Sequence, residues 1–158
     1  MKEHNFNRSK LADIMTFDEA VMLEKLYMDS QKNFPYPIPF NKLYSLVKTK
    51  SNLTTRVIVD FMKWMPKCNA RRINTTGIPQ INKRTKKVTG WIPSGAEKGV
   101  SDIIGSINGR IVNIEVKDKD QQLDSQIAYQ KRVEDAGEIY IIVHNFTEFY
   151  YKFKQLNQ

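Results

Sequence analysis

Cysteine and histidine are scarce in this chain, which has one cysteine and two histidines among 158 residues. The single cysteine, Cys68, excludes an intramolecular disulfide, and no cluster of Cys or His surrounds it in the sequence. We therefore interpret Cys68 as a small apolar side chain rather than as a nucleophile or a zinc ligand. This use of cysteine fits the reducing cytoplasm best.

Long apolar runs are absent as well. No segment approaches the roughly 18 apolar residues that a membrane-spanning helix needs, so we expect no membrane partner. The opening segment, Met1 to Arg8, also lacks the apolar stretch of a signal peptide. We expect a cytoplasmic protein in which residues 1–50 form a helical, proline-rich extension and residues 51–158 form the main domain.

Acidic residues are rare in the middle of the chain. Residues 42–98 contain thirteen Lys and Arg but only Asp60 and Glu97 as acids, which gives this stretch a net charge of +11. The rest of the chain has a net charge of −3, so the total of +8 comes from the middle. This distribution predicts a cationic face that binds a polyanion.

Two apolar, β-branched runs flank the dipeptide Asn108-Gly109, which is the strongest short-range signal for a two-residue type I′ hairpin. If Ile107 faces Arg110 across the turn, the same register places Asp102 opposite Glu115. Like charges directly opposite each other on an antiparallel pair destabilise a sheet. This pairing therefore calls for a physical reason.

The strand that follows Asn108-Gly109 alternates in polarity, so that six of its residues divide between two faces of the sheet. Apolar side chains form one face and polar ones the other: Val112, Ile114 and Val116 against Asn113, Glu115 and Lys117. A hard divalent cation such as Mg²⁺ or Mn²⁺ takes oxygen ligands and would remove the repulsion between the two acids. The alternative is a solvated strand face on which the three charges form ordinary ion pairs.

A helix from Leu123 to Ala136, ended by Gly137, is predicted to follow the hairpin. Gln126, Gln130 and Val133 fall on one stripe of this helix, which would pack on the sheet. Amides need hydrogen-bond partners in a dry core. If the helix crosses the proposed site, they can bond a phosphate, a metal-bound water or Glu115; the alternative places both at the helix edge in water.

The remaining segments also have recognisable signals of secondary structure. We expect helices, short or long, that begin at Thr16 with Glu19 completing its cap, at Asn41, at Asn52 and near Thr147. Pro66 should end the third of these helices. Between the first two, the proline-rich segment 34–40 should be extended, with its aromatic side chains packed on the core; the alternative is a ligand for a partner domain.

Two further strands complete the predicted sheet. Residues 70–76 alternate weakly and suit an edge or second strand, whereas the nearly continuous apolar run 138–143 suits a strand buried on both faces. The connection from Lys117 through a helix to the second of these is long enough for a parallel crossover. The order of elements therefore predicts the α/β class, with a mixed central sheet flanked by helices.

Most candidate contacts to nucleic acid precede the central hairpin in the sequence, and one, Gln130, follows it. The segment 81–91 is basic and is expected to connect two strands; its alternative reading is a solvated loop. Trp91 would either stack on a base or pack against the hairpin. The candidate contacts are Arg72, Asn74, Lys83, Arg84, Lys86, Lys87, Lys98 and Gln130.

Asp102 is followed thirteen positions later by Glu115-Val116-Lys117, and this layout resembles the PD-(D/E)xK nuclease superfamily. Five segments in their order resemble its virus-type replication-repair nuclease (VRR-NUC) branch: 72–77, 98–105, 114–117, Gln126 with Gly137 eleven residues later, and 140–143. The resemblance covers roughly residues 52 to 145. It departs at Ser101, where the superfamily has Pro, and at 53–56, where the first helix often carries an acid and the nearest is Asp60.

The resemblance implies a restriction-endonuclease-like core and a Mg²⁺- or Mn²⁺-dependent endodeoxyribonuclease. Asp102 and Glu115, with the backbone carbonyl of Val116, would bind the metal, while Lys117 would orient the attacking water and Gln126 would steady the assembly. Small members of this branch are typically viral and act as dimers on branched DNA. We therefore expect a Holliday-junction-resolvase-like homodimer of viral or phage origin; the alternatives are a nickase or general endonuclease, and a non-catalytic DNA-binding module.

Overall fold

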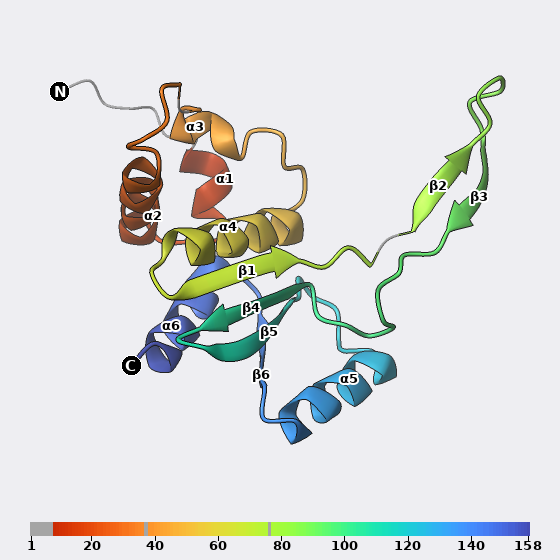
Figure 1. Ribbon diagram of the computed structural model, residues 1–158. Helices are drawn as coiled ribbons and strands as arrows, with labels where there is room; N and C mark the ends of the chain where they lie inside the picture. The colour runs from red at the N-terminus through yellow and green to blue at the C-terminus, as the bar shows by residue number, and fades with distance from the viewer. Residues whose placement is uncertain (1–7, 37, 76) are drawn as a thin grey trace.

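The computed structural model describes residues 8–36, 38–75 and 77–158, and Figure 1 shows the order of its elements. The expectation about a signal peptide falls mostly on residues outside these ranges. The helices are α1 (Arg8–Ala12), α2 (Phe17–Ser30), α3 (Phe40–Leu43), α4 (Lys50–Trp64), α5 (Asp124–Asp135) and α6 (Phe146–Leu156). The strands are β1 (Cys68–Arg72), β2 (Ile78–Ile81), β3 (Val88–Ile92), β4 (Ile103–Ile107), β5 (Arg110–Val116) and β6 (Ile139–Val143).

The centre of the molecule is a mixed four-stranded sheet in the order β1-β4-β5-β6. Strands β1, β4 and β5 are antiparallel neighbours, and β6 is parallel to β5. Helices α4 and α6 cover one face through an apolar cluster around Phe61 and Phe146, and α5 covers the other through Tyr129 and Val133. The predicted α/β class, with a mixed sheet flanked by helices and a parallel crossover, is confirmed.

The central hairpin has the predicted register. Ile107 pairs with Arg110 and Ile103 with Ile114, while the turn residues Asn108 and Gly109 have φ values of 50° and 80°. Positive φ at both turn positions is the requirement of a type I′ turn, and Asn-Gly meets it at little cost. Because this register is fixed, the residues that precede β4 and end β5 are brought together.

The first long helix and the last one begin as the sequence predicts. Thr16 and Glu19 form a reciprocal capping box at the start of α2, and Asn145 caps α6 by accepting from the backbone N–H of Glu148. The last helix packs against the sheet, because Phe146, Phe149 and Phe153 are buried against Phe61. These contacts place the C-terminal helix in the core.

The cap of α4 corrects one prediction. Thr49, not Asn52, caps this helix: its hydroxyl accepts from the backbone N–H of Asn52 at 3.3 Å. Both residue types are good caps, and the earlier one has the extended backbone that a cap requires. The side chain of Asn52 instead accepts a hydrogen bond from Arg72 at 2.6 Å. The helix ends at Trp64, two residues before Pro66, as expected.

The proline-rich segment packs less than the sequence predicts. Phe40 is buried beside the rings of Tyr27 and Tyr44, but Phe34 and Tyr36 are 61% and 93% exposed. The short helix here spans only Phe40–Leu43, and Pro37 lies outside the described residues. Only the last aromatic of the segment reaches the core, because the chain before it runs over the surface.

The N-terminal helices share their apolar core with the sheet. Tyr27 of α2 lies against Trp64 of α4, with ring centroids 5.3 Å apart, and both belong to or pack on the cluster that includes Ile103 and Ile114. The division of the chain at residues 50 and 51 remains a prediction. Among the described helices, none is both long enough and apolar enough to span a bilayer.

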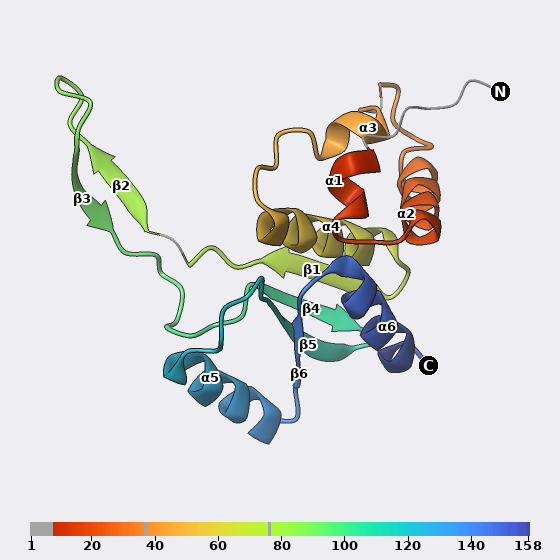
Figure 2. The same cartoon turned by 180° about the vertical axis from the view of Figure 1, so that it is seen from behind.

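The largest correction concerns the segment 81–91, which was predicted to be a basic connection between strands and which belongs to a hairpin formed by residues 78–92. They form a second hairpin, β2 with β3, whose register runs from Ile78 opposite Ile92 to Ile81 opposite Val88 with an irregularity after Gln80. Figures 1 and 2 show that this ribbon, hereafter the arm, extends away from the body of the molecule.

The two outer strands of the sheet also differ from expectation in detail. β1 spans Cys68–Arg72 rather than 70–76, and it is an edge strand as predicted; Thr76 is outside the described residues. β6 is the opposite edge of the sheet, and no residue on either of its faces is fully exposed, in line with its apolar run. An edge strand tolerates this composition here because α5 and α6 both lie next to β6.

Candidate functional site

The two acids that the sequence places opposite each other lie at the end of the β4–β5 pair. Asp102 directly precedes β4, and its Oδ2 accepts a hydrogen bond from the backbone N–H of Val116 at 3.0 Å. Ile103 and Ile114, the pair next to them, face the α4 side, so alternation directs Asp102 and Glu115 to the α5 side. The structure therefore brings both carboxylates to one face of the sheet.

Glu115 is the most deeply buried charged residue of this group, with 3% of its surface exposed. Its Oε1 accepts from the amide of Gln126 and lies 3.2 Å from Nζ of Lys117. Its Oε2 is buried and has no hydrogen-bond partner among the residues that the structure describes. A buried carboxylate oxygen without a partner is costly unless a ligand satisfies it.

The environment of Glu115 disfavours the ionised form of its carboxyl group. Burial raises the pKa of this carboxyl above its ordinary value of 4.5, and the negative charge of Asp102 raises it further. Lys117 partly opposes both effects. One cation beside two carboxylates leaves an excess of negative charge, which is the condition that attracts a second, positively charged group.

Gln126 joins the start of α5 to this cluster. Its Oε1 accepts from Nζ of Lys117 at 2.8 Å and from the backbone N–H of Leu123 at 3.0 Å, while its amide donates to Glu115. It is the third residue of α5, so the side chain reaches back over the first turn. The position of Gln126 on the sheet-facing stripe was visible in the sequence.

Gly99 lets α5 approach the chain that leads to Asp102. It has a φ of +84°, and a Cβ built on it would lie 2.1 Å from the backbone oxygen of Ser125. Only glycine fits this contact without a shift of the backbone. The structure therefore places the first turn of α5 directly beside Gly99.

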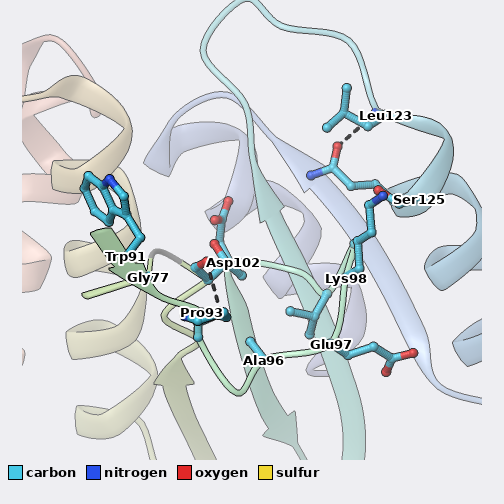
Figure 3. Close-up of a pocket in the computed structure, with 14 residues that line it drawn as sticks. Gly77, Trp91, Pro93, Ala96, Glu97, Lys98, Asp102, Leu123 and Ser125 are labelled. Carbon is cyan, nitrogen blue, oxygen red and sulfur yellow. Dashed lines mark hydrogen bonds between the residues drawn. The ribbon is translucent and has the colours of Figure 1, made fainter. Parts of the chain in front are cut away.

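A pocket of about 620 Å³ opens beside Asp102. Figure 3 shows Trp91 and Pro93 on one side and Ser125 with Lys98 on the other, with the carboxylate of Asp102 between them. Gln126 also lines the pocket, so it connects the buried cluster with the open space. The pocket therefore combines an aromatic wall, a carboxylate, an amide and an exposed lysine.

The other predicted contacts to nucleic acid are spread more widely. Lys83, Arg84, Lys86 and Lys87 are exposed at the tip of the arm, and Arg72 and Asn74 are exposed at and after the end of β1. Gln130 does not reach Glu115: it accepts from Gln122 and donates to Glu134, both at 3.0 Å. Of the two amides on the α5 stripe, the structure brings only Gln126 to the acids.

A buried polar chain that the sequence analysis did not single out lies next to the site. Tyr129 donates to Asn113 at 2.9 Å, and Asn113 donates to Glu138 at 2.7 Å. These contacts hold α5 on β5 at Asn113, which lies two residues before Glu115 on the same face of the strand. The signal for them was the polar residue at position 113 on the same strand face.

A third acid near Asp102 and Glu115 is not found among the described residues. Asp60 on α4 pairs with Arg56 at 3.4 Å, and burial raises the pKa of its carboxyl next to Tyr44. Glu97 pairs with Arg132. Within the described ranges, no group of three or more His, Cys, Asp and Glu residues is arranged to hold a metal ion.

A divalent cation nevertheless fits the two carboxylates that are present. Their oxygen donors suit Mg²⁺ or Mn²⁺, and the Oε2 of Glu115, which has no partner among the described residues, offers a ligand atom. Two carboxylates beside the one ammonium of Lys117 also leave room for a further positive charge. Mg²⁺ commonly binds through one or two carboxylates and otherwise keeps water, so a third acid is not required.

Comparisons with known proteins add no family to this picture. A scan against models of protein families finds no match, and a search of curated proteins finds none either. The resemblance to the VRR-NUC branch therefore stays a prediction, and the support for a function comes from the geometry of the site.

Proposed function

We propose that this protein is a Mg²⁺- or Mn²⁺-dependent DNA endonuclease that hydrolyses phosphodiester bonds. The observation that carries the proposal is the cluster of Asp102, Glu115, Lys117 and Gln126, in which one oxygen of a buried carboxylate has no partner among the described residues. A buried acid with a raised pKa is characteristic of a functional site, and Glu115 is such an acid, next to Asp102 and Gln126, which line the pocket. The cationic arm supports a polyanionic substrate.

Each residue of the cluster has a distinct task in this proposal. Asp102, Glu115 and the backbone carbonyl of Val116 would hold the cation, which when bound would polarise the scissile phosphate and lower the pKa of the attacking water. Lys117 orients that water and offsets negative charge that develops on the phosphate. Gln126 is a positioning residue, because it holds Glu115 and Lys117 together.

The proposed substrate is branched DNA such as a four-way junction, cut by a homodimer. Two symmetric cuts require two sites, which a dimer supplies. The resemblance to small viral nucleases points the same way, and a cytoplasmic setting and a viral or phage origin belong to this proposal. Sedimentation of the full chain with and without a junction measures the oligomeric state.

The test compares cleavage of a four-way junction, a flap, a continuous duplex and a single strand with Mg²⁺, Mn²⁺ or EDTA. Asp102→Asn, Glu115→Gln and Lys117→Ala should each lower metal-dependent cleavage at least about 100-fold, since each removes a ligand or a charge at the reacting phosphate. Asp135→Asn is the matched control, because Asp135 is exposed at the end of α5 and, among the described residues, forms an ion pair only with Lys131.

A second readout does not depend on turnover. Mg²⁺ or Mn²⁺ should raise the melting temperature of the wild type, because a ligand that binds only the folded state stabilises it. The rise should disappear in Asp102→Asn and Glu115→Gln. Wild-type cleavage by all three site variants would refute the assignment of these residues.

The second candidate function is a DNA-binding module without catalysis. It is favoured by one observation, the lack of a third acid near Asp102 and Glu115 among the described residues. Tight binding of DNA with no cleavage under any metal would support this reading. Cleavage of one strand only, on all the duplexes, would instead indicate the nickase, and cleavage of both strands without preference for a branched DNA would indicate the general endonuclease.

A further inference from the structure

Trp91 is an aromatic side chain with no cover at the edge of the candidate site. It is 61% exposed on β3, whereas the second of the two tryptophans, Trp64, is partly buried beside Tyr27. Exposed tryptophans that line a pocket often provide a binding surface, because the indole has a large apolar face. Neither the metal site nor the catalytic cluster explains its position.

The base of the arm holds this indole in place. Trp91 pairs with Pro79 across the ribbon. Gly77 lies so close to the other strand that a Cβ built on it would be 2.6 Å from the backbone oxygen of Ile92. The wall on which Trp91 stands is therefore formed by two closely paired segments of chain.

The opposite wall and the floor of the pocket have a different chemistry. Lys98 and the first turn of α5 form the wall, and Asp102 lies between this wall and Trp91, as Figure 3 shows. The volume of about 620 Å³ lies in the range of pockets that bind small ligands. A ligand that fits this lining needs a flat ring at one end, to contact Trp91, and at the other end a negative group that reaches Lys98.

A nucleotide has both parts, but a base inside a continuous duplex does not offer its ring. Such a base is paired and stacked on both sides, and extracting it costs free energy. A base at a gap or a flap is already unpaired, and a base at the branch point of a junction lies at an interrupted stack and is more easily unpaired; either can stack on an aromatic side chain instead. The pocket would thus select DNA that offers an unpaired base, whatever the sequence of that DNA.

We propose that the pocket binds one unpaired nucleotide of the DNA substrate, with its base stacked on Trp91 and its phosphate toward Lys98. The inference rests on the proposed function and deepens it, since it explains how a cut would be confined to branched or interrupted DNA. Trp91 is a specificity-determining residue in this scheme, not a catalytic one.

The experiment uses the presence of only two tryptophans. In the full chain carrying Trp64→Phe, Trp91 is the sole indole, and its fluorescence reports directly on stacking. In EDTA, the variant is titrated with a continuous duplex and with the same duplex containing one unpaired nucleotide, a gap, a flap or a four-way junction. The unpaired position carries 2-aminopurine as a second reporter.

Both fluorophores should be quenched by the DNAs with an unpaired nucleotide and not by the continuous duplex. Which of the four DNAs quenches most strongly identifies the source of the nucleotide. Trp91→Ala should weaken binding of the preferred DNA about tenfold or more while leaving duplex binding within about twofold, because stacking on one base contributes on this scale. Trp91→Phe should retain most of the preference.

Equal quenching by the continuous duplex would overturn the inference, and so would an equal loss of affinity for all DNAs in Trp91→Ala. Trp91→Phe guards against a folding defect as the cause of that loss. This experiment and the cleavage assay can fail independently of each other. Quenching without any metal-dependent cleavage would remove the nuclease and keep the pocket, whereas cleavage without quenching would do the reverse.

Discussion

The molecule contains two antiparallel hairpins with the same local pairing and opposite surroundings. In the β4–β5 hairpin, Ile103, Ile107 and Ile114 are fully buried, because helices cover both faces. In the β2–β3 arm, Ile78 and Ile92 form a pair whose members remain 62% and 48% exposed. The first hairpin sets the geometry of the acids, and the second presents a surface.

The difference shows where the stability of each hairpin originates. An isolated two-stranded ribbon is at best marginally stable in water, whereas a hairpin inside a covered sheet is stabilised by packing. The arm has apolar side chains without cover and a cationic tip, a combination that suits contact with a ligand more than a role in the core. Substitutions in the two hairpins should therefore have very different effects.

The largest expected effect separates two isoleucines of the same chemistry. Ile114→Ala should lower the free energy of unfolding by about 2–5 kcal/mol, because it leaves a cavity between the sheet and its helices. Ile92→Ala should lower it by less than about 1 kcal/mol, because its side chain is half exposed. Urea unfolding measures both. Similar losses at the two positions would mean that the arm is covered in solution.

The next effect concerns the arm alone. Replacing Lys83, Arg84, Lys86 and Lys87 by Gln should weaken DNA binding about tenfold or more at about 0.1 M salt, and lower the slope of log affinity against log salt by up to about 3 to 4, because each phosphate contact releases a counterion. Unfolding should change by less than about 0.5 kcal/mol. Fluorescence anisotropy over a salt series measures the slope.

The matched control neutralises four exposed lysines elsewhere. Lys25, Lys32, Lys131 and Lys154 are exposed and lie on α2, on α5 and α6, or just after α2. Their replacement by Gln changes the net charge equally. An equal loss of affinity and slope in this control would assign DNA binding to overall charge and not to the arm.

The smallest effect lies in the covered hairpin and depends on pH. Because burial and Asp102 raise the pKa of Glu115, the folded chain binds this proton more tightly than the unfolded chain does. Ionisation of Glu115 therefore costs stability as pH rises above its ordinary value of 4.5. In metal-free buffer, Glu115→Gln should melt slightly higher than the wild type near pH 7, within about 1 kcal/mol, and the difference should shrink toward pH 4.5.

Calorimetry over this pH range measures the difference, with Glu134→Gln as the control. Glu134 is exposed and accepts only from Gln130 among the hydrogen bonds described here, so its replacement should have little effect at any pH. A wild type that is more stable than Glu115→Gln at pH 7 without metal would show that Lys117 outweighs burial and Asp102.

The covered hairpin was predictable from the sequence, and the arm was not. Asn108-Gly109 between alternating runs determines the turn and the register within a few residues. The arm has a longer turn that places Lys86 at a φ of 57°, and Pro79 within β2 argues against a strand in a sheet. Its apolar residues lack a clear alternation, so a basic loop was the simpler interpretation.

The site was predictable to the extent that it depends on periodicity. Alternation along β5 and the stripe on α5 predict from the sequence alone that Glu115, Lys117 and Gln126 share one surface. The contact of Gly99 with Ser125 and the position of Trp91 were not accessible in this way. They depend on the path of the chain between elements that are distant in sequence, and no local pattern encodes that path.

The way in which the arm is attached links it to the acids. The chain leaves the sheet after Ile73 and returns at Asp102, and the backbone N–H of Ile73 donates to the backbone oxygen of Asp102 at 2.8 Å. This bond joins the segment that leads from the sheet into the arm to the segment that returns from it. Bending of the arm by a bound partner would therefore also move the backbone that carries the Asp102 carboxylate, so the position of the arm and that of the proposed metal ligand are coupled through this bond.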